Sequence, residues 1–171
     1  MTKFFKMVVC VSAVGGLAGP ALAQNSATST TSATTTIIQP ISIANNSLLA
    51  FGRIVKPSTA VTSNIAIDAS SGDRTVGAGA IAAPGASSRA TYTATGEGAQ
   101  TFSISAPSFS MTSGANTLAV TTSTSAATGT LSGTLGSTGT ATFGVGGAFN
   151  VTDTTPSGLY TGNLAVTVAY N

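Results

Sequence analysis

Apolar and polar side chains alternate with a period of two along most of this chain. From residue 41 onward, aliphatic or aromatic residues recur at every second position in a series of short segments, and Gly, Pro, Asn and Asp lie between these segments. A period of two is typical of β-strands that bury one face. No segment shows the sustained three-to-four spacing of an amphipathic helix. The pattern therefore predicts an all-β protein.

The alternation also indicates how many strands to expect and where the chain turns. Residues 68–73 form a cluster of turn residues, residues 77–85 are predicted as a loop, and Gly96-Glu97-Gly98 is predicted as a hairpin turn. About seven to ten short strands separated in this way are typical of an antiparallel, immunoglobulin-like β-sandwich. The predicted strands are residues 41–43, 49–55, 61–67, 89–95, 101–105, 109–111, 118–120, 140–151 and 158–171.

The beginning of the chain differs from this middle part. Lys3 and Lys6 precede an apolar stretch that is too short to span a membrane, and Ala21-Leu22-Ala23 follows it. This arrangement predicts a secretory signal peptide at residues 1–23. Residues 24–38 form a tract rich in Ser, Thr and Ala, which is predicted as an extended N-terminal segment. The β-sandwich domain is predicted at residues 39–171.

After residue 23 the charged side chains balance. Four scattered cations form no stripe that could follow a phosphate backbone, so nucleic-acid binding is not expected. No apolar run in this part of the sequence is long enough to span a bilayer. The charged residues are Arg53, Lys56, Arg74 and Arg89 against Asp68, Asp73, Glu97 and Asp153.

Composition also excludes most catalytic sites. The chain has no His, and its one cysteine, Cys10, lies in the predicted signal peptide. The exported chain therefore lacks the base of a Ser-His-Asp or Cys-His triad and the nitrogen and sulfur ligands of a zinc site. Lys56 and the four acidic residues are predicted to be solvated charges at strand ends and turns. No enzyme activity, metal or cofactor is expected.

The last segment has the most regular alternation in the sequence. Residues 158–171 are predicted as one long strand whose apolar face continues to the penultimate residue. Chain ends are usually frayed, so an apolar face that reaches the end requires a neighbour that buries it. That neighbour is either the rest of an ordinary sandwich or another chain. The face consists of Tyr160, Gly162, Leu164, Val166, Val168 and Tyr170.

Both ends of the chain resemble those of chaperone–usher pilus subunits. Subunits of that family end in an alternating strand with an aromatic penultimate residue and a Gly fourteenth from the end, and these are Tyr170 and Gly158 here. Residues 26–40, which close on Ile37, Ile38 and Pro40, resemble the N-terminal donor strand of such subunits. Residues 157–161 and the run Val166-Thr167-Val168 resemble the end of the disulfide-free, capsule-like type.

The middle of the chain resembles a different group of proteins. Residues 49–54 and 139–147 are similar to segments of secreted bacterial β-proteins that are classified only as a domain of unknown function. This second likeness covers most of the chain after residue 23. It implies a β-sandwich and assigns no activity.

The pilus resemblance implies a mechanism. It implies a pilin-like sandwich that lacks one strand, is held by a periplasmic chaperone and an outer-membrane usher, and is completed by the N-terminal strand of another copy. The expected location is the periplasm and then the surface fimbria of a Gram-negative bacterium. The implied donor residues are Ala27, Ser29, Thr31, Ala33, Thr35 and Ile37. The implied chaperone-binding and acceptor residues are Gly158, Tyr160, Leu164, Val166, Val168 and Tyr170.

A second hypothesis stays open beside the fimbrial subunit. A monomeric secreted sandwich could complete its sheet with its own N-terminus and act as an adhesin or a glycan-binding protein. Glycan sites usually use aromatic platforms, and this chain has no Trp and three Tyr. The sequence therefore favours the fimbrial subunit.

Overall fold

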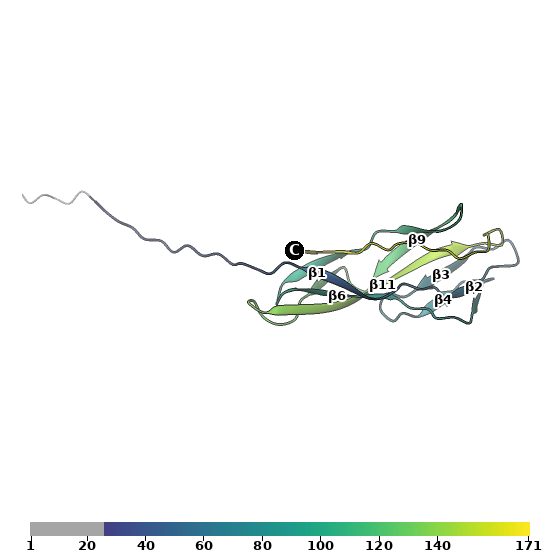
Figure 1. The fold of residues 1–171 in the computed structure, drawn as a ribbon, viewed down its shortest axis with the longest axis horizontal. Helices are drawn as coiled ribbons and strands as arrows, with labels where there is room; N and C mark the ends of the chain where they lie inside the picture. Colours follow the sequence, from purple (N-terminus) through teal and green to yellow (C-terminus); the bar gives the residue numbers. More distant parts are fainter. Residues whose placement is uncertain (1–25) are drawn as a thin grey trace, which may run out of the picture. The chain divides into compact units, whose positions relative to one another are not determined.

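The computed structural model describes residues 26–171, and this part of the chain contains β-strands and no helix (Figure 1). The strands pair antiparallel, and the sheets curl into a sandwich-like arrangement. The predicted fold class is thereby confirmed. Residues 26–171 include no helix that could cross a membrane. The predicted signal peptide at residues 1–23 lies outside the described residues.

The strands differ widely in length. β11 has 14 residues and β9 has nine, whereas β2, β4, β5 and β10 have three each. In chain order the strands are β1 (Ser42–Ser47), β2 (Arg53–Val55), β3 (Ser63–Ile67), β4 (Arg74–Val76), β5 (Ile81–Ala83), β6 (Ala90–Glu97), β7 (Thr101–Ser105), β8 (Phe109–Ser113), β9 (Asn116–Thr124), β10 (Thr128–Thr130), β11 (Thr138–Val151) and β12 (Thr167–Tyr170).

β11 organises the first sheet. Its residues 138–145 pair with β6, and its residues 147–151 pair with β3. β9 pairs with the opposite edge of β11, because Val145 has one partner in β6 and another in β9. β1 continues the sheet beyond β6, and β4 continues it beyond β3. The order is therefore β1-β6-β11-β3-β4, and the hairpin of β8 and β9 is attached to β11.

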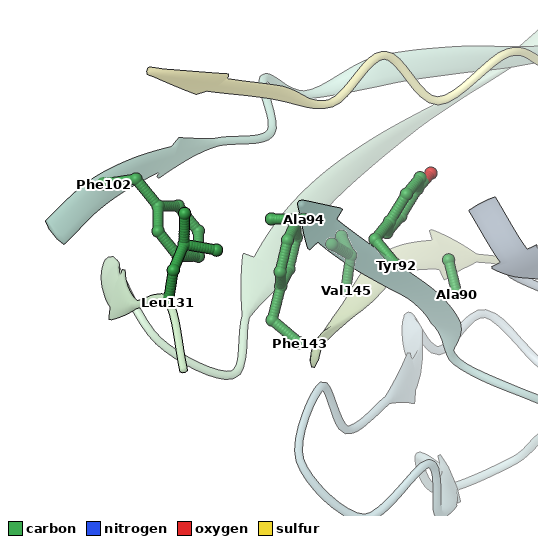
Figure 2. Packing of buried hydrophobic residues seen from close by; sticks show 7 residues of the cluster. All are labelled: Ala90, Tyr92, Ala94, Phe102, Leu131, Phe143 and Val145. Carbon is green, nitrogen blue, oxygen red and sulfur yellow. The ribbon is translucent and has the colours of Figure 1, made fainter. Parts of the chain in front are cut away.

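A second sheet, with the order β10-β7-β12, packs on the first through an apolar core. The ring of Tyr92 in β6 stacks on Phe143 in β11 with centroids 5.6 Å apart, and Phe102 in β7 lies 6.4 Å from the same Phe143 ring. Each large apolar side chain buried in this way contributes about 1.5–3 kcal/mol relative to exposure. Figure 2 shows the cluster as a row made of Phe102, Leu131, Ala94, Phe143, Val145, Tyr92 and Ala90.

A second core cluster lies under the other half of β11. The rings of Phe51 and Phe149 meet edge to face, with centroids 4.8 Å apart and an interplanar angle of 89°. The alternation in β3 and in the last residues of β11 produces this cluster, since Ile65, Ile67, Phe149 and Val151 are buried and the residues between each pair are more exposed. Its buried members are Phe51, Ile65, Ile67, Val120, Phe149 and Val151.

Two glycines in β11 allow the close approach of another backbone segment. A side chain at Gly144 would collide with the carbonyl oxygen of Ala69, and one at Gly146 would collide with that of Ile67. The Gly-rich stretch of residues 144–147 therefore serves strand packing at Gly144 and Gly146, because only glycine leaves room for that backbone.

Two predictions about turns are wrong. Residues 77–85 were expected to be a loop, but they contain β5, which pairs with β2. The hairpin expected at residues 96–98 does not form: Gly96 and Glu97 still belong to β6, and the chain turns at residues 98–99, where Ala99 takes the left-handed backbone conformation with φ of 61°. The strands on either side of this turn, β6 and β7, lie in different sheets and do not pair. The ladder continues because Glu97 pairs with Thr138 across the two strands. The turn at residues 68–73 is confirmed, since the Asp68 carboxylate accepts the N–H groups of Ser70 and Ser71.

The prediction of one continuous strand over residues 158–171 is also wrong. Only β12 forms a ladder, with β7, and Thr161 makes one isolated bridge to Thr112 in β8. The ladder begins at residue 167 because that residue pairs with Ser105, which ends β7. Figure 2 shows this segment, in pale yellow, as a coil that becomes a strand only at its end. Its alternation is nevertheless real, because residues 164, 166, 168 and 170 are half-buried and the residues between them are exposed.

The described part of the N-terminal segment has a plain structure. Residues 26–40 form no strand, and each of them is exposed. Their small polar side chains have little apolar surface to bury, which is why alternation alone does not fold them into a sheet. The role of residues 24–38 as a donor strand stays a prediction.

Candidate functional site

One side of the sandwich is open between β1 and β12. Within the described residues, β1 pairs only with β6, and β12 pairs only with β7. These two strands belong to different sheets and lie near each other without a ladder between them. Each therefore presents a sheet edge whose outward N–H and C=O groups are free to pair with another strand.

The chain segment before β12 extends this open side. Thr161 exchanges two backbone hydrogen bonds with Thr112, at 2.8 and 3.0 Å. In the part of the chain that the structure describes, residues 162–165 make no backbone hydrogen bond. Peptide groups of this kind must pair with water or with a further strand.

An apolar groove follows this segment. It consists of two hollows of about 600 and 710 Å³ that share Leu49, Phe51, Met111 and Tyr160 in their walls. We call the two together the C-terminal groove. The first hollow is also lined by Ile43, Leu48, Tyr92, Phe109, Leu164 and Val166. The second is also lined by Ile54, Val55, Leu118, Phe149, Val151 and Leu159.

Several elements build the groove walls, and β2, β6, β9 and β11 contribute to them besides the four segments described next. β1 contributes Ile43, the chain after β1 contributes residues 48–51, β8 contributes Phe109 and Met111, and the segment before β12 contributes residues 159–166. Leu48 and Leu159 at the rims are 75% and 82% exposed. Apolar side chains with this exposure, next to a hollow of this size, indicate a surface that another group covers.

The polar groups near the groove have structural partners. The Lys56 ammonium, at one end of the second hollow, donates to the carbonyl oxygens of Asp153 and Thr155 at 2.6 and 3.0 Å. Burial raises the pKa of the Tyr92 phenol above its ordinary value of 10.0, so this group is neutral at physiological pH. Residues 26–171 contain no cluster of three or more His, Cys, Asp or Glu that could hold a metal ion.

The predicted acceptor residues divide between the groove and the core. Tyr160, Gly162, Leu164 and Val166 line the groove, and so does Gly158 at its far end. Val168 and Tyr170 lie in β12 and line neither hollow; they pack against the first core cluster, as Leu164 and Val166 also do. The predicted donor residues, from Ala27 to Ile37, are all exposed.

Sequence reasoning missed the opposite wall of the groove. Ile43, Leu49 and Met111 were assigned to strands of the sandwich, and no feature of their spacing distinguishes a wall from a core position. It also missed Glu97, because the pattern predicts a solvated turn residue there, whereas this side chain is only 2% exposed. The flanking Gly96 and Gly98 suggested a turn, whereas both lie in tight contact with neighbouring segments.

The comparison with protein families gives one match. A family model described as Domain of unknown function (DUF4402) matches residues 41–170, so the chain belongs to this family. No curated protein and no solved structure matches the chain. The matched residues include every strand and both walls of the C-terminal groove, and the description of the family assigns no activity to them.

Proposed function

We propose that this member of the DUF4402 family is a structural subunit of a cell-surface fimbria or a similar polymer. In this proposal, residues 24–38 of one copy enter the C-terminal groove of the next copy. The observation that carries it is the apolar groove between β1, which pairs only with β6, and the segment before β12, whose residues 162–165 make no backbone hydrogen bond in the described part of the chain. A ligand for such a site offers main-chain hydrogen bonds and alternate apolar side chains, and an extended strand offers both.

The N-terminal segment has the properties of that strand. Its side chains are exposed, and it carries small residues at alternate positions from Ala27 to Thr35. Fully extended, residues 25–38 would reach about 46 Å at about 3.3 Å per residue. The segment ends in Ile37 and Ile38, which are 88% and 41% exposed. Large apolar side chains with this exposure gain free energy when a groove covers them.

Addition of one copy to the next is head to tail and does not close. Such a contact repeats and produces a filament. Before addition, the open groove and the free edges of β1 and β12 would favour aggregation. A periplasmic chaperone that lends an edge strand, and an outer-membrane usher that exchanges it for the donor, are therefore the partners that we propose. Export through the signal peptide at residues 1–23 belongs to the same proposal.

Deletion of residues 25–36 tests the proposal. The exported parent chain should form a ladder of oligomers in size-exclusion chromatography with light scattering, and the deletion variant should stay a single subunit. A synthetic peptide of residues 24–38 should bind the deletion variant and raise its Tm. The matched control is the same peptide with Ile37→Asp, which should bind at least tenfold more weakly, because it places a charge in an apolar groove.

Two outcomes would overturn the proposal in different ways. Oligomers formed by the deletion variant would show that residues 25–36 are not the donor. A monomeric parent chain whose deletion variant unfolds would favour the secreted sandwich that fills its groove with its own N-terminus and acts as an adhesin or glycan-binding protein. Intact-mass measurement of the exported chain, expected to begin at Gln24, checks the processing on which both designs depend.

A further inference from the structure

Glu97 is a buried carboxylate that the groove does not use. It is the last residue of β6, it is 2% exposed, and its side chain lies among backbone groups. Oε1 accepts the N–H of Gly136, and Oε2 accepts the N–H of Gln39 at 3.1 Å. Removing a carboxylate from water is costly, so the burial of Glu97 between two peptide N–H donors indicates that this side chain has a specific role.

Gln39 is held at three points by this region. Its N–H donates to Glu97, its carbonyl oxygen accepts the Tyr170 hydroxyl at 2.9 Å, and its side-chain oxygen accepts the Thr138 hydroxyl at 3.0 Å. The Tyr170 oxygen also accepts the N–H of Glu97, at 2.7 Å. Thr138 is the cross-strand partner of Glu97, so β6, β11 and β12 all contribute to one cluster around a single residue.

The position of Gln39 in the chain indicates the role of this cluster. Residues 26–40 are exposed and form no strand, yet Gln39 has both of its peptide groups bonded to the domain. Pro40 follows, and its ring fixes the backbone just after the bonded residue. Gln39 is therefore the root from which the N-terminal segment leaves the sandwich. Close packing protects this root, because a side chain at Gly96 would collide with the Tyr170 hydroxyl.

We propose that Glu97 and Tyr170 are positioning residues that anchor the root of the N-terminal strand at Gln39. The proposal rests on the proposed function, in which that strand joins one subunit to the next. Anchoring both peptide groups of Gln39 removes rotations at the point where the joint begins, so the joint between subunits is stiff. A carboxylate suits this task better than an amide, because both of its recorded partners are N–H donors.

Amide hydrogen exchange at Gln39 tests the anchoring in the exported chain. In the parent, this amide should exchange slowly. Glu97→Gln should accelerate its exchange by about tenfold or more, because an amide side chain cannot accept at both positions. Tyr170→Phe keeps the ring and removes the hydroxyl, and it should accelerate exchange at Gln39 and Glu97. Gln39→Ala is the matched control, since it keeps both peptide groups and should leave the exchange slow.

The stiffness of the filament distinguishes a positioning role from a merely structural one. Filaments of Glu97→Gln and Tyr170→Phe should bend more in electron micrographs, with a persistence length at most half that of the parent, while the Tm of the subunit and the exchange of the Val145 amide stay near parent values. Parent-like exchange at Gln39 in both variants would overturn the anchoring. Fast exchange with unchanged filament stiffness would overturn the positioning role.

Failure of the proposed function would give a different result. If the peptide of residues 24–38 does not bind the deletion variant and the parent forms no filament, fimbrial assembly is wrong and the role at a joint is wrong with it. The exchange experiment still decides whether Glu97 and Tyr170 hold Gln39, because it is read in the single subunit.

Discussion

β11 and the C-terminal segment carry the same kind of sequence and have different structures. Both alternate apolar and polar residues over a dozen positions or so. β11 has partner strands on both edges, and Phe143, Val145 and Phe149 are buried. In the C-terminal segment only residues 167–170 form a ladder, and Leu164 and Val166 are half-buried beside a groove.

The difference teaches what alternation does and does not report. A period of two states which face of a segment is apolar, and both segments obey it. Whether the segment becomes a paired strand depends on whether another edge is available at that place in the fold. β11 finds such edges within the chain, whereas residues 162–165 find none in the described residues. An apolar face without a paired backbone is what a groove for an incoming strand requires.

The largest effect is expected where the pairing is complete. Val145 lies in the first core cluster and has no exposed surface. Val145→Asp would bury an unpaired carboxylate between two sheets, so the free energy of unfolding should fall by more than about 4 kcal/mol. Chemical denaturation followed by circular dichroism measures this change. Thr142→Asp on the exposed face of β11 is the control and should change stability by about 0.5 kcal/mol or less. Equal losses would contradict the assignment of faces in β11.

A smaller effect is expected in β12, where pairing is on one edge only. Val168 is half-buried against the first core cluster, and Thr167 is exposed. Val168→Asp should lower the free energy of unfolding by about 2 kcal/mol, and Thr167→Asp by about 0.5 kcal/mol or less. Thermal unfolding of the two variants side by side tests the alternation. Equal tolerance at both positions would show that the period of two does not hold in this strand.

Local pattern was enough to predict much of the sandwich. The alternation around Tyr92 and Phe143 correctly predicts which faces of β6 and β11 are buried, because the direction of each side chain follows from its position within its own strand. The turn at residues 68–73 could be predicted because Asp68 bonds residues only two and three positions away.

What could not be predicted depends on residues far apart in the chain. Glu97 is buried because its carboxylate meets the N–H of Gln39, 58 residues away. Tyr170 bonds Gln39 over 131 residues, so its hydroxyl has a role that its place in the apolar row did not suggest. The extent of β12 was overestimated for the same reason, since it depends on where β7 ends. Spacing along one segment contains none of this information.

A substitution in the C-terminal groove should abolish binding of the N-terminal peptide with little loss of stability. Leu164 lines the first hollow and is half-buried. Leu164 packs against the first core cluster as Val168 does, but it also lines the open hollow, where a new carboxylate can reach water, so Leu164→Asp should lower the free energy of unfolding by about 1 kcal/mol. Capture of the peptide of residues 24–38 by the deletion variant should nevertheless be abolished. Isothermal titration of that peptide measures this, with Ala165→Asp on the exposed side as the control. Undiminished binding by Leu164→Asp would place the acceptor site elsewhere.

The smallest effect is expected in the turn between β3 and β4. The Asp68 carboxylate accepts the N–H groups of Ser71 and Ser70 at 2.7 and 2.8 Å, and these bonds hold its pKa below the ordinary value of 3.8. A carboxyl whose folded-state pKa is depressed stabilises the fold above the unfolded-state pKa, and this contribution is lost as pH falls through the folded-state value.

Asp68→Asn should therefore cause a small decrease in Tm at pH 7, and the difference from the parent should shrink once the pH falls below about 3.8 and disappear when the parent carboxyl is protonated. Asp73→Asn is the control, because Asp73 takes part in the same turn through its backbone groups. Thermal scans of the three proteins from pH 2 to pH 7 measure the difference. A Tm difference between the parent and Asp68→Asn that stays constant over this range would show that the charge of Asp68 does not stabilise the turn. The strands on either side of the turn would then depend on their ladders alone.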